Sequence, residues 1–212
     1  PSITEEQTAI WLQGALNQMG EPRLPDERYV LIKFDSWHIM AMPFLLTLFP
    51  DVPYILVYRS PVEIMMSHRR AVGYQMVPGM IEPEWFQWKP SNIHEIPQVE
   101  YCARVLGKLS QSALQNHLDD RGLLVNYSQL PDFVWTKLLD LFHIERTADQ
   151  IRTMHHRAQF EAKQPRFIYQ PNTPERLMKP PEEISFLAKK WIEPWYLVME
   201  EMRLGFNRKP DG

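Results

Sequence analysis

The sequence predicts an α/β protein in which a short parallel sheet is flanked by helices and helix dominates over strand. Three short runs rich in β-forming residues, at residues 29–34, 54–58 and 123–127, lie between longer segments whose apolar residues recur at helical spacing. Strands that alternate with helices in this way are typical of a parallel sheet. The 212 residues suffice for a single domain with a substantial core, residues 180–204 forming a C-terminal helix docked on it.

Composition excludes several classes of protein. The formal net charge of -3 argues against a non-specific nucleic-acid binder, which would be markedly basic. The single cysteine, Cys102, excludes an internal disulfide and a cysteine-based zinc site, and we expect it to be a small buried residue on a helix. No apolar run is long enough to cross a bilayer and no signal peptide opens the chain. These observations predict a cytoplasmic protein without a membrane partner.

The first elements follow from capping signals and apolar spacing. Residues 4–19 form an expected helix with Thr4 as its N-cap and an apolar face along its length. Residues 29–34 are expected to form a strand with Lys33 near its end. Residues 39–49 are expected to form the next helix.

The strongest local signal lies at the centre of the chain. The apolar run Tyr54–Tyr58 predicts a buried strand, and Ser60 and Glu63 then have the spacing of a capping box with Pro61 at the first helical position. Arg59 therefore lies between the carboxyl end of a strand and the start of a helix. In open α/β sheets ligands bind at this edge, and helix N-termini favour anions.

Arg59 and Ser67 are candidate ligands of a phosphate group. They are eight residues apart, so Ser67 lies about two helical turns beyond Arg59. A guanidinium fork and a hydroxyl suit phosphate oxygens. The alternative is that Arg59 forms a salt bridge at the strand end and that Ser67 hydrogen-bonds to its own helix.

Residues 73–91 are too long and irregular for an ordinary connection. Loops of this length in compact domains are often lids or binding loops. The large side chains of this segment predict an apolar ligand pocket. The alternative is that they pack back on the core. These side chains are Met76, Met80, Trp85, Phe86 and Trp88.

The second half of the chain predicts further helices at residues 92–117, 131–142 and 147–157. The C-terminal helix at residues 180–204 is expected to be kinked near Pro194. The strand at residues 123–127 would place Tyr127 at the ligand edge. His155 and His156 are adjacent, so they do not face each other on a helix and are poor candidates for a metal site.

Three segments together resemble PAPS-dependent sulfotransferases of the bacterial type. RSPVEIMMS is similar to the family's R-x-P-x-(D/E)-x-x-x-S segment, which binds the donor's 3′-phosphate. The upstream stretch from YVLIKFDSWH to LFPDVP and the downstream stretch LLVNYSQLPDFVWTKLLDLFHI resemble the flanking strand and helix units, in the family order. The resemblance covers residues 29–144. It implies a P-loop-type fold without a metal requirement.

The resemblance also implies residue roles. PAPS would be the donor and 3′,5′-ADP the product, with Arg59 and Ser67 on the 3′-phosphate and Tyr127 on the adenine. Sulfuryl transfer needs a cation near the leaving oxygen and a base for the acceptor hydroxyl. Lys33 would supply the cation and His38 the base. Asp35 is a rival base, because the spacing of His38 from Lys33 differs from the Lys-x-His pattern of cytosolic members.

One part of the family pattern is absent from this sequence. The family grips the 5′-phosphosulfate with a Pro-Lys-Ser/Thr-Gly-Thr-type turn after its first strand, and no such turn occurs here. The fold is therefore expected to lack its first strand-loop unit, through N-terminal truncation or a modified donor site.

Two functions follow as alternatives. The first is transfer of a sulfuryl group to a hydroxyl or amine of a small molecule, with an apolar or aromatic acceptor and with homo-oligomerisation left open. The second is a non-catalytic relative that binds a nucleotide or a protein through the same frame. A metal-independent nucleotide kinase is less favoured, because it needs the phosphate loop even more.

Overall fold

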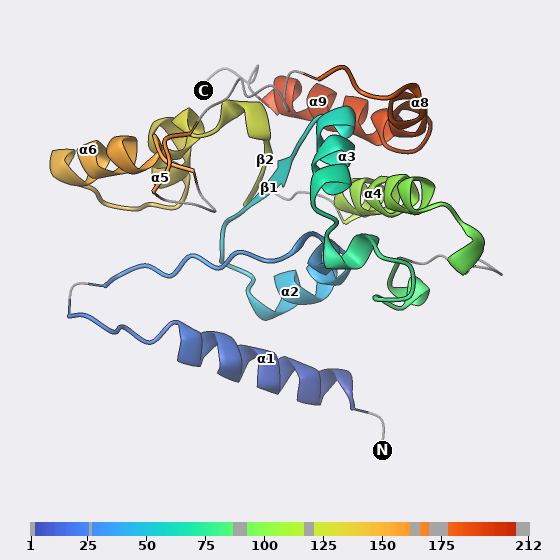
Figure 1. Cartoon of the computed structure of the whole chain (residues 1–212). Helices are drawn as coiled ribbons and strands as arrows, with labels where there is room; N and C mark the ends of the chain where they lie inside the picture. The colour runs from blue at the N-terminus through green and yellow to red at the C-terminus, as the bar shows by residue number, and fades with distance from the viewer. Residues whose placement is uncertain are drawn as a thin grey trace.

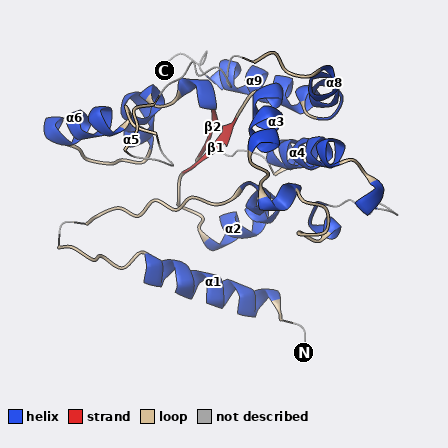
Figure 2. Ribbon diagram, viewed as in Figure 1, coloured by secondary structure: helices blue, strands red, loops and turns tan. Residues whose placement is uncertain are grey.

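The computed structural model describes residues 3–25, 27–86, 93–116, 121–161, 166–169 and 178–206. It is helix-rich with a small parallel sheet, as the sequence predicts (Figure 2). The helices and strands are α1 (Glu5–Met19), α2 (Met42–Leu48), β1 (Tyr54–Tyr58), α3 (Pro61–Arg70), α4 (Gln98–Gln115), β2 (Gly122–Asn126), α5 (Leu139–Leu141), α6 (Ala148–Arg157), α8 (Glu182–Trp191) and α9 (Glu193–Phe206). Within the described residues, short 3₁₀ helices and a π-helical turn, Val134–Leu138, connect them.

The two strands run parallel and in register. Tyr54 lies opposite Gly122 and Tyr58 opposite Asn126, so both strands end at the same level. In Figure 1, α3, α4, α8 and α9 gather on one side of the strands and α5 and α6 on the other. This arrangement places helices around the sheet edge where Arg59 and Tyr127 emerge.

The hydrophobic core lies where α3, α4 and α8 meet. Its fully buried side chains include Tyr101 and Val105 of α4, and Met65 of α3 is almost as buried. Cys102 is buried on α4, as expected, and its burial raises the pKa of the thiol to about 12. An apolar stripe on α4 thus holds α3 and α8 beside the sheet.

Residues 29–34 do not form the predicted strand. The segment is extended but has no strand partner in the described part of the chain, and Leu31 is 66% exposed. An apolar β-like run becomes a strand only where another strand takes up its backbone hydrogen bonds. The segment is anchored instead through Tyr29, whose hydroxyl accepts from the backbone N–H of Glu145 at 3.1 Å. Lys33 is therefore not at the end of a sheet strand, which corrects its predicted position.

Helix boundaries follow the expected signals with local shifts. Thr4 and Thr147 both cap their helices through capping boxes. The predicted C-terminal helix is divided at Ile192 into α8 and α9, two residues before Pro194. The proline has no N–H to continue the helix and its ring clashes with the preceding turn.

The loop that begins at Gly73 packs two of its large side chains onto the core. Met76 and Phe86 are fully buried, so for them the alternative of core packing is correct and the predicted pocket lining is wrong. Met80 and Trp85 remain about half exposed. Trp88 lies outside the described residues.

Candidate functional site

The candidate site lies at the carboxyl edge of the two-stranded sheet. Tyr58 and Asn126 form the last register pair, so the next residues along each strand, Arg59 and Tyr127, emerge beside each other. The Arg59 guanidinium carbon lies 4.7 Å from the centroid of the Tyr127 ring. This is a cation–π contact. Two of the predicted nucleotide-binding residues therefore meet in space, although they are far apart in sequence.

Arg59 is also paired with an acidic residue of α3. Its Nε donates to Oε2 of Glu63 at 2.9 Å, with the Arg59 side chain 29% and the Glu63 side chain 58% exposed. The salt bridge expected as the alternative for Arg59 is therefore present. An exposed ion pair of this kind is weak, so it leaves the guanidinium available for exchange with another anion.

The start of α3 differs from the predicted capping box. Pro61 begins the helix after Ser60, but the Ser60 side chain makes no cap hydrogen bond, and Glu63 turns to Arg59 instead. Glu63 binds Arg59 in preference to the backbone N–H of Ser60, because a carboxylate forms a stronger hydrogen bond with a guanidinium than with a backbone N–H. The first turn of α3 therefore presents backbone N–H groups without a side-chain cap beside Arg59.

Ser67 lies one helical turn beyond Glu63. It is half-buried, and its hydroxyl has no hydrogen-bond partner in the described part of the chain. The predicted alternative, a bond from Ser67 to its own helix, is thus absent. Glu63 and Ser67 are four residues apart, so they share one face of α3.

The predicted catalytic residues lie on a different segment. Lys33 is exposed in the extended stretch, and no hydrogen bond or ion pair among the described residues joins it to Arg59, Ser67 or Tyr127. The His38 ring stacks on Trp37 at 5.4 Å, and its Nδ1 lies 3.2 Å from the carbonyl oxygen of Asp35.

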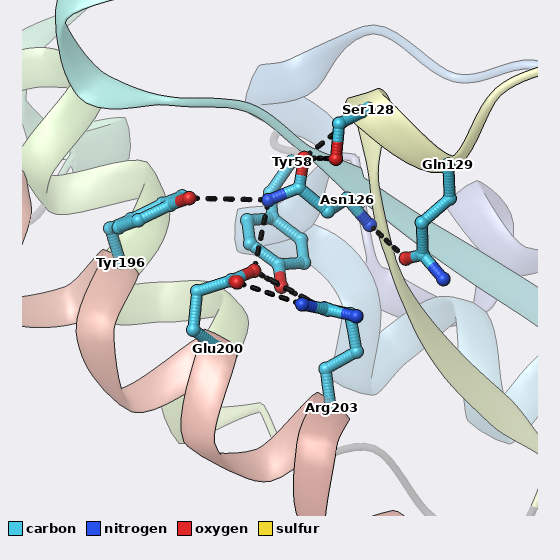
Figure 3. A network of polar contacts seen from close by, with 7 residues as sticks. All are labelled: Tyr58, Asn126, Ser128, Gln129, Tyr196, Glu200 and Arg203. Carbon is cyan, nitrogen blue, oxygen red and sulfur yellow. Dashed lines mark hydrogen bonds and ion pairs between the residues drawn. The ribbon is translucent and has the colours of Figure 1, made fainter. Parts of the chain in front are cut away.

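A polar network missed by the sequence analysis lies directly beneath the edge (Figure 3). Glu200 of α9 accepts hydrogen bonds from the Tyr58 hydroxyl and, at 2.9 Å, from Nδ2 of Asn126. Arg203 donates to the Tyr58 hydroxyl at 3.1 Å and to Glu200 at 2.8 Å. Tyr196 completes the group, because its hydroxyl accepts from Asn126 at 3.2 Å. Both strand ends are therefore bound to one helix.

The network fixes the charge state of its members. Hydrogen bonds from Arg203, followed by those from Tyr58 and Asn126, outweigh burial and lower the pKa of Glu200 to about 2. Burial and the neighbouring Glu200 carboxylate raise the pKa of Tyr58 well above its usual value. Glu200 is thus an anion and Tyr58 a neutral donor across the physiological range.

Sequence reasoning had one available clue to this network. Asn126 ends β2 next to Tyr127, and a polar side chain at the end of a buried strand needs a hydrogen-bond partner. Its partner Glu200 is 74 positions away, on the C-terminal helix. Only tertiary packing joins the two.

Other predicted features contribute no site. The described residues contain no group of three or more His, Cys, Asp or Glu that could hold a metal ion. His155 and His156 face separate aromatic rings, those of Trp135 and Phe160. None of the described helices combines the length and apolar character needed to span a membrane.

Comparison of the chain with protein-family models, with curated proteins and with solved structures finds no match. The geometry of the Arg59 edge is therefore the basis on which a function can be inferred.

Proposed function

We propose that the protein is a PAPS-dependent sulfotransferase whose 3′-phosphate site is the carboxyl edge of β1 and β2. The observation that supports it is the contact between Arg59 and Tyr127, which joins a guanidinium and an aromatic face at one point. A phosphorylated nucleoside needs both, because its phosphate binds a cation and its base stacks on a ring. Ser67 and the uncapped start of α3 add further donors on the same side.

In this proposal each residue has a distinct task. Arg59 and Ser67 bind the 3′-phosphate and Tyr127 stacks on the adenine. His38, or Asp35 as its rival, takes the proton of the acceptor hydroxyl as the new oxygen–sulfur bond forms. Lys33 stabilises the charge on the phosphate oxygen as its bond to sulfur breaks, and 3′,5′-ADP leaves.

The acceptor would lie beside the 3₁₀ helices of the Gly73 loop. A hollow of about 370 Å³ is lined there by Met40, Ala41, Glu84 and Trp85. The exposed indole of Trp85 supports an apolar or aromatic acceptor.

Calorimetric titration with 3′,5′-ADP tests the site directly. Arg59→Ala should weaken binding by roughly 10- to 100-fold, since a charged hydrogen bond contributes ~1.5–3 kcal/mol. Ser67→Ala should weaken it less, because it removes a neutral hydroxyl.

Arg70→Ala is the matched control for this titration. It removes an exposed arginine from the other end of the same helix, so it should leave the affinity unchanged. Equal binding by the unmodified chain and Arg59→Ala would contradict the proposed site.

The second candidate function is nucleotide binding without transfer. The absence of a Pro-Lys-Ser/Thr-Gly-Thr-type turn from this sequence favours it. Radiolabelled PAPS with a panel of phenols and aromatic amines separates the two: 3′,5′-ADP binding without labelled product would favour the binding module.

A further inference from the structure

One carboxylate of helix α9 contacts the ends of both strands. Oε1 of Glu200 accepts from Asn126 of β2 and from the Tyr58 hydroxyl of β1, and Figure 3 shows these side chains converging on it. Arg203 donates through Nε to the same Oε1 at 3.2 Å and holds the carboxylate in place. The Glu200 and Arg203 side chains are only 22% and 17% exposed, so solvent competes little for these bonds.

The residues held by Glu200 are the immediate neighbours of the candidate site. Tyr58 precedes Arg59 and Asn126 precedes Tyr127, and the two are register partners. One peptide unit separates each held residue from the one that would touch the ligand. A shift of either strand end would therefore move Arg59 relative to the Tyr127 ring.

Asn126 also fixes the turn that carries Tyr127. Its Oδ1 accepts from the backbone N–H of Ser128 at 3.0 Å and from the Ser128 hydroxyl at 2.9 Å. Its own backbone N–H donates to Oε1 of Gln129 at 2.9 Å. Tyr127 thus lies in a turn whose following residues are hydrogen-bonded to Asn126, and Asn126 is bonded in turn to Glu200.

We propose that Glu200 is a positioning residue that sets the relative placement of Arg59 and Tyr127 through Tyr58 and Asn126. The consequence for ligand affinity rests on the proposed function, whereas the placement itself does not. C-terminal helix α9 then has a part in the site although none of its residues is assigned to the ligand.

The test compares Glu200→Gln with Glu201→Gln. Both changes remove one negative charge from adjacent positions on α9, but Glu201 is exposed and makes none of the network contacts. The amide introduced by Glu200→Gln can keep only part of the hydrogen bonds, because it has one acceptor oxygen where the carboxylate has two. Tyr58→Phe is a second variant that removes one hydroxyl from the network without a change of charge.

Two quantities are measured for each variant, both at a temperature well below that at which the protein unfolds. The first is the NMR resonances of the Arg59 Nε–H and the Tyr127 ring in the ligand-free protein. The second is the dissociation constant for 3′,5′-ADP. We expect Glu200→Gln and Tyr58→Phe to shift the resonances, Glu200→Gln to weaken binding about tenfold, and Glu201→Gln to change neither.

The outcomes separate the two proposals. Unshifted Arg59 and Tyr127 resonances in folded Glu200→Gln and Tyr58→Phe, even with a lower unfolding temperature, would overturn the positioning role and leave a purely stabilising network. Shifted resonances with no 3′,5′-ADP binding by the unmodified chain would support positioning and overturn the proposed function. If Glu200→Gln does not fold, the resonances of Tyr58→Phe decide.

Discussion

Arg59 has two partners in the ligand-free protein. Glu63 accepts from its Nε, and its guanidinium carbon lies over the Tyr127 ring. A planar guanidinium can bind a carboxylate at its edge and an aromatic ring at its face at once, which a lysine ammonium cannot do equally well. Glu63 therefore occupies Nε, one of the guanidinium donors that a phosphate could use.

The competition between Glu63 and a phosphate predicts the effect of Glu63→Gln. Removal of the carboxylate frees Nε of Arg59 and removes a negative charge next to the incoming anion. We expect the affinity for 3′,5′-ADP to rise about 2- to 5-fold in calorimetric titration, since exposed ion pairs contribute up to ~1 kcal/mol.

Glu5→Gln serves as the control for this change. It removes an exposed carboxylate from α1, which stands apart from the sheet edge in Figure 1. It should leave the affinity at the unmodified value. Weaker binding by Glu63→Gln would instead show that the ion pair holds Arg59 in its binding position.

At the scale of elements, the close approach of α4 and α8 shapes the core. A Cβ placed on Gly107 of α4 would lie 3.1 Å from the carbonyl carbon of Trp191 and closer still to its oxygen. Trp191 is the last residue of α8, just before the break at Ile192. The absence of a side chain at Gly107 is thus what allows the helices to meet at this point.

Gly107→Ala should destabilise the protein for this reason. An alanine normally stabilises a helix by about 0.5–1 kcal/mol over glycine. Here, however, its methyl group would clash with the carbonyl group of Trp191, which can move only if α8 moves with it. We expect the free energy of unfolding in urea to fall by about 1–3 kcal/mol.

Gly14→Ala in α1 is the matched control, because nothing lies within 4 Å of a Cβ at that position. It should leave the free energy of unfolding unchanged or slightly higher. A neutral Gly107→Ala would mean that α4 and α8 separate more easily than their packing implies.

At the scale of the whole molecule, the described chain divides into a packed region and an N-terminal arm. None of the residues of α1 is buried, and Trp11 is 60% exposed. Figure 1 shows α1 standing apart at the end of the extended segment that leads to α2. In contrast, α4 buries eight residues, including Tyr101 and Leu109.

This division predicts a hierarchy of hydrogen exchange. Amides of α1 have only their own helix to protect them, and isolated helices of this length are marginal in water. In hydrogen exchange measured by mass spectrometry, the amides of α1 should exchange orders of magnitude faster than those of α4, because the α4 amides exchange only when the whole protein unfolds. Equal protection of α1 and α4 would show that the exposed face of α1 is covered in solution.

Elements that depend on local signals could be predicted from the sequence. The limits of β1 follow from five β-forming residues between proline-containing turns, and α1 and α6 begin where Thr4 and Thr147 predict. These features depend on residues within one or two turns of each other. The position of Arg59 directly after a strand and before a helix is also a property of the neighbouring sequence.

The remaining features needed the folded chain, because they depend on groups that are distant along it. Residues 29–34 have strand composition but no strand partner in the described chain. Glu63 leaves the predicted cap because Arg59 competes for it. The contact of Arg59 with Tyr127 and the bonds of Glu200 to both strand ends require the parallel register and the docking of α9, since no spacing in the sequence encodes a distance through space.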